Sequence, residues 1–436
     1  MNTPIRDFVE KYIASEAVRA HMPGHKGKTL LGCEQADITE IAGADSLYEA
    51  SGIIKESEAN ASKLFGCESF YSAEGSSLCI RAMLYLLKRQ GVTRLIASRN
   101  AHKSFISGCA LLDFSPIWLK ASEYLSCGID NCELFELLLQ SNEKTAVFIT
   151  TPDYLGGCAD IKAISALCKA SGAYLCVDCA HGAYLKFLPE SLYPTDLGAD
   201  MCCSSAHKTL PVLTGGAYLH IASTAPKAFC ENAKSALSLF GSTSPSYLIL
   251  QSLDTANAYI ANGYPERLSE FIIKVNIAKG RLKDHGFVLC GSEPLKLTLK
   301  PKSYGYCGGE LAKLLENAGI FPEFADSDYL VLMLTPENAD SLDKIITALL
   351  SAERRQAIKD SAPDLCDCPY AISLREALFA ESEIIKASQS LGRILAQFNI
   401  ACPPAVPIAV CGERINEQAL KCFEYYGIKE ISVVKE

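Results

Sequence analysis

Three polar stretches that each contain a histidine directly follow apolar runs and could supply catalytic groups. They are Ser98-Arg-Asn-Ala-His102-Lys-Ser, Asp178-Cys-Ala-His181-Gly and Ser204-Ser-Ala-His207-Lys208-Thr. A fourth stretch, Glu74-Gly75-Ser76-Ser77, opens an expected helix, where amide and hydroxyl groups could bind a phosphate at the positive end of the helix dipole. Because polar residues that follow the strands of an open parallel sheet gather at one edge, these stretches are candidates for a single site.

Together the stretches contain the groups that pyridoxal 5'-phosphate (PLP) requires of a protein. This cofactor needs a lysine for a Schiff base and a carboxylate beside its pyridine nitrogen, and Lys208 and Asp178 could supply them. It also needs a phosphate cradle and a flat group over its ring, for which Gly75-Ser76-Ser77 and His102 are available. Each piece alone has a more ordinary explanation, since Gly-Ser turns and helix-capping aspartates are common. Their shared position favours a PLP site.

Helices and short apolar runs alternate from about Gly75 to Ile221, and this alternation would position the four stretches. The expected strands are Arg94–Ser98, Ile117–Leu119, Thr145–Thr150, Ala173–Asp178, Met201–Ser204 and Gly216–Ile221. The expected helices are one that is capped by Ser76 or Ser77 and ends before Gly91, then Ser104–Leu112, Glu133–Gln140 and Asp160–Ala170. The pattern predicts an α/β fold with a mostly parallel sheet and helices on both faces.

The flanking sequence predicts further elements and a division into four segments. Pro4–Arg19 is an expected helix, Pro245–Lys283 is mainly helical, and a β-α-β-α order follows from Pro294 to Ser351. The predicted segments are an N-terminal helix and arm (1–50), a large PLP-binding domain with a linker helix (51–283), a small α+β domain (284–354) and a C-terminal segment (355–436).

Composition excludes several classes of protein. With 49% hydrophobic and 21% charged residues in 436, the chain is not generally disordered, and a net charge of −9 argues against a nucleic-acid binder. The absence of a polybasic patch, a signal-peptide pattern or an 18-residue apolar run predicts a cytoplasmic protein with no membrane partner. Twenty scattered cysteines indicate reduced thiols. Cys176 with Cys179, and Cys366 with Cys368, lack a matching second pair, so no metal site is predicted.

Nine motifs in chain order carry a resemblance to a known family over almost the whole sequence. They are HMPGHKG (21–27), ADITEIAGADSLYEASGIIKESE (36–58), SRNAHKSFISG (98–108), TTPDYLGGCADI (150–161), VDCAHGA (177–183), SSAHKTLPVLTGGAYLH (204–220), TSPSYLILQSLD (243–254), SLREALFAESEIIKASQSLGRI (373–394) and PPAVPIAVCGERI (403–415). With these motifs the chain resembles the bacterial PLP-dependent ornithine/lysine/arginine decarboxylases of the aspartate-aminotransferase fold (PLP fold type I), in the compact form without an N-terminal wing domain. The resemblance implies a seven-stranded-type sheet in a large domain with a smaller α+β domain.

The resemblance also implies a role for each matching residue. Lys208 would carry the cofactor, Asp178 would pair with the pyridine nitrogen, and His102 would stack on the ring. The other implied cofactor contacts are Ala180 on the opposite face and Gly75, Ser76, Ser77, Ser205 and His207 around the phosphate and active site. Lys208 or His207 would return a proton to the α-carbon.

A basic substrate needs an acidic partner for its distal cation. The candidates in the sequence are Glu40, Asp45, Glu323 and Asp326. Of the residues near the expected site, His181 and Glu323 are predicted to contact the substrate.

The implied activity is decarboxylation of lysine, arginine or ornithine to the corresponding di- or polyamine, by a homodimer or larger even assembly with its active site between subunits. An aminotransferase or lyase on the same scaffold is an alternative, and the former would need an arginine such as Arg393 or Arg414 for the α-carboxylate. A non-catalytic PLP-binding homologue is a third possibility, although the intact lysine, aspartate and histidine argue against it. Gly215 and Gly216 replace a glutamine and a small residue of many relatives, and Cys179 is also unusual, which leaves rate and substrate choice open.

Overall fold

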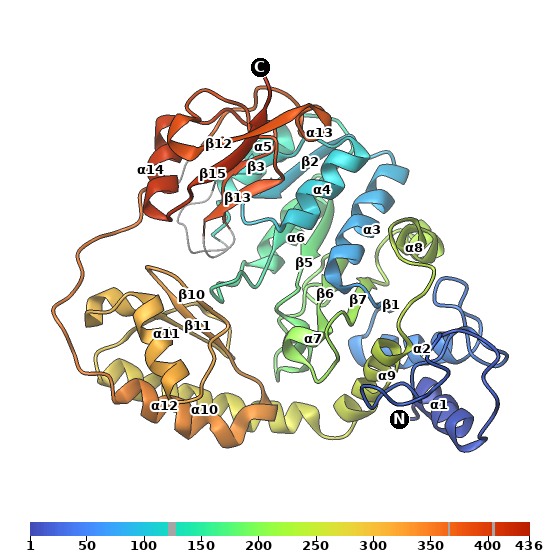
Figure 1. Cartoon of the computed structure of the whole chain (residues 1–436). Helices are drawn as coiled ribbons and strands as arrows, with labels where there is room; N and C mark the ends of the chain where they lie inside the picture. Colours follow the sequence, from blue (N-terminus) through green and yellow to red (C-terminus); the bar gives the residue numbers. More distant parts are fainter. Residues whose placement is uncertain (121–127, 365–366, 403–405) are drawn as a thin grey trace. The chain divides into compact units, whose positions relative to one another are not determined.

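The computed structural model describes residues 1–120, 128–364, 367–402 and 406–436, which form two compact units. Unit 1 comprises Met1–Gly91 and Tyr174–Leu268, and unit 2 comprises Val92–Ala173 and Ser269–Glu436. Within the described chain, a seven-stranded sheet has the order β1-β7-β6-β5-β4-β2-β3 (Figure 1). Its strands are β1 (Glu68–Ser72), β2 (Arg94–Ser98), β3 (Ile117–Leu119), β4 (Thr145–Thr150), β5 (Tyr174–Asp178), β6 (Met201–Ser204) and β7 (Ala217–Ile221).

Most of this sheet is parallel, as predicted. β2 pairs in parallel with β3 and β4, and β5 pairs in parallel with β6, whereas β7 runs antiparallel to both β6 and β1. β1 is missing from the strands predicted by the hydrophobic pattern, because only Phe70 and Tyr71 of its five residues are strongly apolar. The α/β class and the seven-stranded sheet are confirmed.

Unit 1 contains helices α1 (Pro4–Ala14), α2 (Ile53–Phe65), α3 (Gly75–Arg89), α8 (Lys227–Phe240) and α9 (Tyr247–Ala261), and α1 packs against α2 and α9 (Figure 1). α3 packs on β1, β6 and β7 and against α8. The predicted serine cap of α3 is wrong, because the N-cap residue is Glu74 and Ser76 and Ser77 lie inside the helix. The N-terminal helix also ends at Ala14 rather than Arg19.

Unit 2 contains α4 (Lys103–Leu112), α5 (Asn131–Leu139) and α6 (Ile161–Ala170), close to their predicted bounds. A second sheet, of order β10-β11-β9-β8, is antiparallel throughout and consists of β8 (Val288–Cys290), β9 (Lys296–Lys300), β10 (Phe324–Ala325) and β11 (Leu330–Met333). Helix α11 (Gly308–Asn317) packs on β10 and β11 and against α12 (Leu342–Leu350). The predicted helical stretch from Pro245 consists of α9 and α10 (Tyr264–Asp284), which are separated at Asn262-Gly263, where Gly263 has a φ of +77°.

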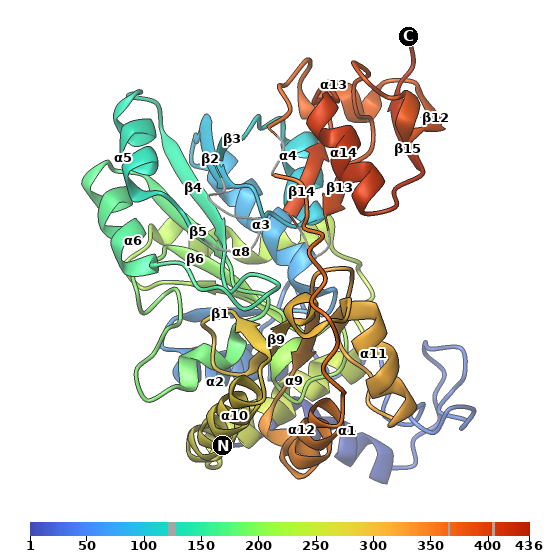
Figure 2. The same ribbon diagram turned by 90° about the vertical axis from the view of Figure 1, so that its left-hand side faces the viewer.

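The C-terminal part of unit 2 has its own small core (Figure 2). It contains α13 (Leu374–Phe379), β12 (Ser382–Lys386), β13 (Asn399–Cys402), β14 (Val406–Val410), α14 (Glu417–Tyr425) and β15 (Glu430–Val434). Strands β12 with β15, and β13 with β14, form antiparallel pairs, and α13 packs against α4. Residues 403–405 of the ninth motif lie outside the described residues.

A buried ion pair connects this C-terminal part to the stretch that follows β2. Nη1 and Nη2 of Arg99 donate to the two carboxylate oxygens of Glu413 at 2.5 and 2.8 Å, and the two residues are only 9% and 1% exposed. Glu413 also accepts the backbone N–H of Val410 at 2.9 Å. Two of the motifs, RNAHKS and CGERI, are therefore held together by charge-assisted hydrogen bonds.

The described residues include no helix with the length and apolar composition needed to cross a bilayer. They also include no group of three or more histidine, cysteine or acidic side chains placed to hold a metal ion, and Cys366 lies outside them. The division into four segments stays a prediction.

His220 on β7 is enclosed by aromatic rings in unit 1. It is fully buried, its ring centroid lies 4.4 Å from that of Phe65 and 5.2 Å from that of Tyr218, and its Nδ1 lies 2.9 Å from the hydroxyl of Ser69. Burial, with a smaller effect from the positive charge of Lys186, lowers the pKa of His220 to about 3. The folded protein therefore keeps this imidazole neutral.

This burial predicts a loss of stability in acid. Between pH 6.5 and about 3 the unfolded chain binds one proton at His220 that the folded chain does not, so the free energy of unfolding falls as the pH falls. The contribution is about 1.4 kcal/mol per pH unit. In urea unfolding across this range, His220→Phe should show a slope that is smaller by this amount, whereas Ser69→Ala should keep the parental slope. Equal slopes for His220→Phe and the parent would contradict the assignment.

Candidate active site

The register between β5 and β6 places Asp178 at the carboxyl end of the sheet beside Cys203. Asp178 is the last residue of β5, pairs with Cys203 and is only 2% exposed. Its Oδ1 accepts the backbone N–H of Ala180 at 3.1 Å and the thiol of Cys203 at 3.6 Å. Among the described residues, Oδ2 accepts no hydrogen bond, which leaves one carboxylate oxygen for a ligand.

Lys208 reaches the same edge from the segment that follows β6. Ser205 is the N-cap residue of the four-residue helix α7 (Ala206–Thr209), which contains Lys208. The Nζ of Lys208 lies 3.0 Å from Nε2 of His181, a buried residue that follows β5 three positions after Asp178. The two strand ends therefore bring an amine, an imidazole and a carboxylate to one edge of the sheet.

His207 makes a different set of contacts from its neighbour Lys208. Its backbone N–H donates to the carbonyl of Gly216 at 3.2 Å, and its Nδ1 lies 2.9 Å from the same oxygen. The imidazole is thus anchored to the backbone of the segment from Ser205 to Gly216 that carries Lys208, called the lysine loop below. The amine of Lys208 contacts His181, and the role of His207 in proton transfer stays a prediction.

The first turn of α3 and the lysine loop are joined at two points. The backbone N–H of Gly75 donates to the carbonyl of Gly215 at 2.7 Å, and the hydroxyl of Ser205 donates to that of Ser76 at 2.8 Å. Gly75 has a φ of +70° and open space on the side where a Cβ would lie, and Ser77 is half-buried one residue beyond Ser76. Hydroxyl and amide groups at the start of a 15-residue helix suit a phosphate.

The backbone geometry explains the glycine at position 215. Gly215 has a φ of +101°, and a Cβ there would lie 2.9 Å from the carbonyl oxygen of Ala73. Only glycine adopts this conformation without strain. The close approach of the Ala73 carbonyl, beside the expected phosphate-binding turn, therefore explains why this chain has glycine at position 215.

Two predicted site residues, His102 and Glu323, belong to unit 2 and are described within it. His102 is the N-cap residue of α4, where its Nδ1 accepts the N–H of Ser104 at 3.2 Å while the residue itself is exposed. Glu323 is exposed, and its Oε1 accepts the hydroxyl of Tyr154 at 2.9 Å. The roles of these two side chains stay predictions.

Two of the other acidic candidates, Asp45 and Asp326, have clear structural partners. Asp45 accepts the backbone N–H groups of Gly52 and Ile54, at 2.7 and 3.1 Å, at the start of α2. Burial raises the pKa of Asp45, but the backbone hydrogen bonds outweigh this effect, so the net shift is downward. Burial raises the pKa of Asp326 to about 6, and its Oδ1 accepts two N–H groups of the turn before β11. Glu40 is exposed.

The two arginines considered for an aminotransferase are both engaged in the C-terminal part of unit 2. Arg393 donates to Glu383 at 2.7 Å and to the carbonyl of Val434 at 2.8 Å. Arg414 donates to the carbonyl of Gly392 at 2.6 Å. Both guanidinium groups therefore have local partners that explain their presence.

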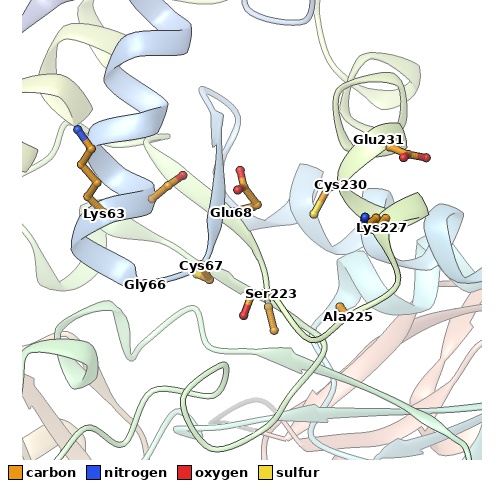
Figure 3. A pocket seen from close by; sticks show the side chains of 11 residues that line it. Lys63, Gly66, Cys67, Glu68, Ser223, Ala225, Lys227, Cys230 and Glu231 are labelled. Atoms are coloured by element: carbon orange, nitrogen blue, oxygen red, sulfur yellow. The ribbon is translucent and has the colours of Figure 1, made fainter.

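A separate pocket of about 620 Å³ lies in unit 1, between the end of α2, the start of β1 and α8 (Figure 3). Its charged side chains have both signs, with Lys63 and Lys227 opposed by Glu68 and Glu231. None of the predicted site residues lines it.

The fold and the cluster at the sheet edge are those expected of the fold type I class of PLP enzymes. Residues 3–290 match the family described as Orn/Lys/Arg decarboxylase, major domain, and the chain belongs to this family. It is 28% identical to an arginine decarboxylase of Bacillus subtilis (strain 168), over 95% of this chain and 92% of the relative. It is 29% identical to the uncharacterized protein YaaO of the same organism, over 97% and 93% of the two chains.

A comparison of structures gives the same fold. Lysine decarboxylase A from Pseudomonas aeruginosa aligns with a TM-score of 0.80 at 16% identity, over 99% of this chain and 80% of that chain. Together these matches confirm the predicted family, fold type and enzyme class, that of the amino-acid decarboxylases. The family implies PLP, and the unit 1 cluster of amine, buried carboxylate, hydroxyls and helix-start amides has the donor set that this cofactor needs.

A substitution in the lysine loop tests whether its close contact with the start of α3 stabilises the fold and helps to retain PLP. Gly215→Ala should lower the free energy of unfolding by about 1–3 kcal/mol, because the new Cβ enters a positive-φ conformation against the Ala73 carbonyl. It should also speed the loss of PLP from the holoenzyme, because the backbone hydrogen bond from Gly75 to the carbonyl of Gly215 would be displaced. Urea unfolding and dialysis followed by absorbance measure the two effects.

Gly280→Ala is the matched control, because Gly280 lies inside α10 with no atom within 4 Å of the Cβ position. This variant should be as stable as the parent, or more so, and should retain PLP. Indistinguishable behaviour of the two variants would show that the Gly215 contact has no effect on the cradle.

Proposed function

We propose that this chain decarboxylates arginine to agmatine and carbon dioxide, with PLP bound at Lys208. The choice of arginine rests on the alignment with a curated arginine decarboxylase over nearly the full length of both chains. The lysine decarboxylase structure shares the fold at a much lower identity and therefore does not favour lysine. Lysine and ornithine remain the alternative substrates.

The proposed site assigns a separate task to each group at the sheet edge. PLP, when bound, accepts the electron pair that remains when the carboxylate of the substrate leaves as carbon dioxide. The buried negative charge of Asp178 favours a protonated ring nitrogen, because an opposite charge nearby stabilises the cationic form. Ser76, Ser77 and the N–H groups of the first turn of α3 hold the phosphate.

We also propose that His181 moves a proton to and from the amine of Lys208. The supporting observation is the 3.0 Å distance between Nε2 of His181 and Nζ of Lys208. Imidazole is suited to this task because its ordinary pKa is close to neutral. The substrate contact that the sequence predicts for His181 stays a separate proposal for this residue.

Further parts of the proposal concern the distal cation of the substrate, the remaining cofactor contacts and the assembly. Glu323 offers an exposed carboxylate, oriented by Tyr154, for a guanidinium or ammonium group. Stacking of His102 on the cofactor, packing of Ala180 on its other face and the additional contacts from Ser205 and His207 follow the family pattern. A homodimer with its active site between subunits and a cytoplasmic location are likewise proposals.

The function is tested with the purified, PLP-reconstituted chain. Release of carbon dioxide and formation of the amine should be measured with arginine, lysine and ornithine in turn, and arginine should give the highest kcat/KM. Lys208→Ala should release no carbon dioxide and lack the visible absorption band of lysine-bound cofactor. A preference for lysine or ornithine would overturn the choice of arginine, and turnover by Lys208→Ala would overturn the site.

The role of His181 is tested separately. His181→Gln should retain PLP but lose about 100-fold in kcat, the lower end of the range for general acid–base groups, and the pH profile of kcat should lose one limb. His285→Gln, an exposed histidine of unit 2, serves as the control and should match the parent. A parental pH profile for His181→Gln would rule out proton transfer by this residue.

A further inference from the structure

We propose that Cys203 is a positioning residue for Asp178, whose Oδ1 it holds through its thiol so that Oδ2 stays available to the ring nitrogen of the cofactor. The inference rests on the proposed function, because it takes Asp178 as the carboxylate that faces this nitrogen. Cys203 itself touches neither substrate nor cofactor in this scheme. It would act on the reaction only through the orientation and charge of the aspartate.

The strand pairing makes this contact a fixed feature of the sheet. Asp178 and Cys203 are paired residues of β5 and β6, and the backbone N–H of Cys179 donates to the carbonyl of Cys203 at 2.9 Å, which extends the ladder past the aspartate. The thiol lies 3.6 Å from Oδ1, and the two residues are 0% and 2% exposed. Because close packing in a buried sheet restricts side-chain rotamers, the thiol of Cys203 stays directed at Asp178.

The thiol is the donor in this contact. Burial, followed by the negative charge of Asp178, raises the pKa of Cys203 well above its ordinary value, so the sulfur keeps its proton. Oδ1 therefore has two donors, the thiol and the backbone N–H of Ala180. Both fall on the same oxygen, so the carboxylate is oriented from one side only.

A thiol suits this task for a chemical reason. It is a weak hydrogen-bond donor, so it orients the carboxylate without withdrawing much of its negative charge. That charge is what keeps a neighbouring pyridine nitrogen protonated. A strong cationic donor at the same place would neutralise the charge.

The chain contains a matched control in the preceding residue of the same strand. Cys202 is also fully buried, but successive strand side chains point to opposite faces of the sheet. Cys202 interacts with Cys179, Cys67 and Tyr193, and Asp178 is absent from the groups that shift its pKa. Cys202→Ala and Cys203→Ala thus remove the same atom from the same strand, and only the second removes a donor from Asp178.

The experiment uses the holoenzyme of five variants: Cys203→Ala, Cys203→Ser, Cys202→Ala, Asp178→Asn and the double variant Cys203→Ala/Asp178→Asn. The measurements are the rate of PLP loss, the visible circular dichroism of bound PLP, and kcat and KM. Cys203→Ala should lose PLP about two- to tenfold faster than the parent, the range expected for one hydrogen bond, and should lower kcat with KM unchanged. Cys203→Ser, which restores a donor, should recover most of both losses, and Cys202→Ala should match the parent.

The double variant separates positioning from packing. If the thiol acts through the carboxylate, Cys203→Ala should have no further effect on PLP loss once Asp178 is asparagine. Equal effects of Cys203→Ala and Cys202→Ala, or a full effect of Cys203→Ala in the asparagine background, would overturn the inference while leaving the proposed function intact. Parental PLP retention and kcat in Asp178→Asn alone would instead overturn the assignment of Asp178.

Discussion

Parallel pairing between β5 and β6 determines which side chains meet at the carboxyl end of the sheet. Asp178 and Cys203 form the last residue pair of this register, and the imidazole and the amine of the site follow this pair by a short distance along the chain. Three residues after the aspartate comes His181, and five residues after the cysteine comes Lys208. A slip of the register by one residue would turn each of these side chains to the opposite face, so the chemistry of the site depends on the strand ladder.

The second constraint is the contact between two glycine-containing turns. The start of α3 and the lysine loop are far apart in sequence, yet a backbone hydrogen bond from Gly75 to Gly215 and a serine–serine contact join them. Neither contact involves a charged group. The positive potential available to a phosphate therefore comes from the backbone amides at the start of α3. The charged side chains of the site lie instead at the ends of β5 and β6.

Local pattern predicts much of this fold, because strand and helix positions depend on periodic apolar residues. The bounds of β2, β3, β4 and β6 agree with the hydrophobic runs to the residue. The cap of α3 is predicted wrongly because the hydroxyl of Ser76 finds its partner at Ser205, 129 positions away, rather than at the nearest backbone N–H. The contact between Cys203 and Asp178 likewise depends on register, which no local spacing reveals, although aligning the ends of the two predicted strands would have suggested it.

The ion pair between Arg99 and Glu413 limits how far the chain can be shortened. The family match ends at residue 290, which invites the view that the remainder is an optional appendage. Yet the carboxylate that neutralises the buried guanidinium after β2 comes from position 413, near the C-terminus. A fragment that ended at the family boundary would keep this cation, three residues before His102, in an apolar setting without its counter-charge. The C-terminal segment that carries Glu413 thus supplies the counter-charge for the RNAHKS motif, and a shortened chain would have to replace that charge.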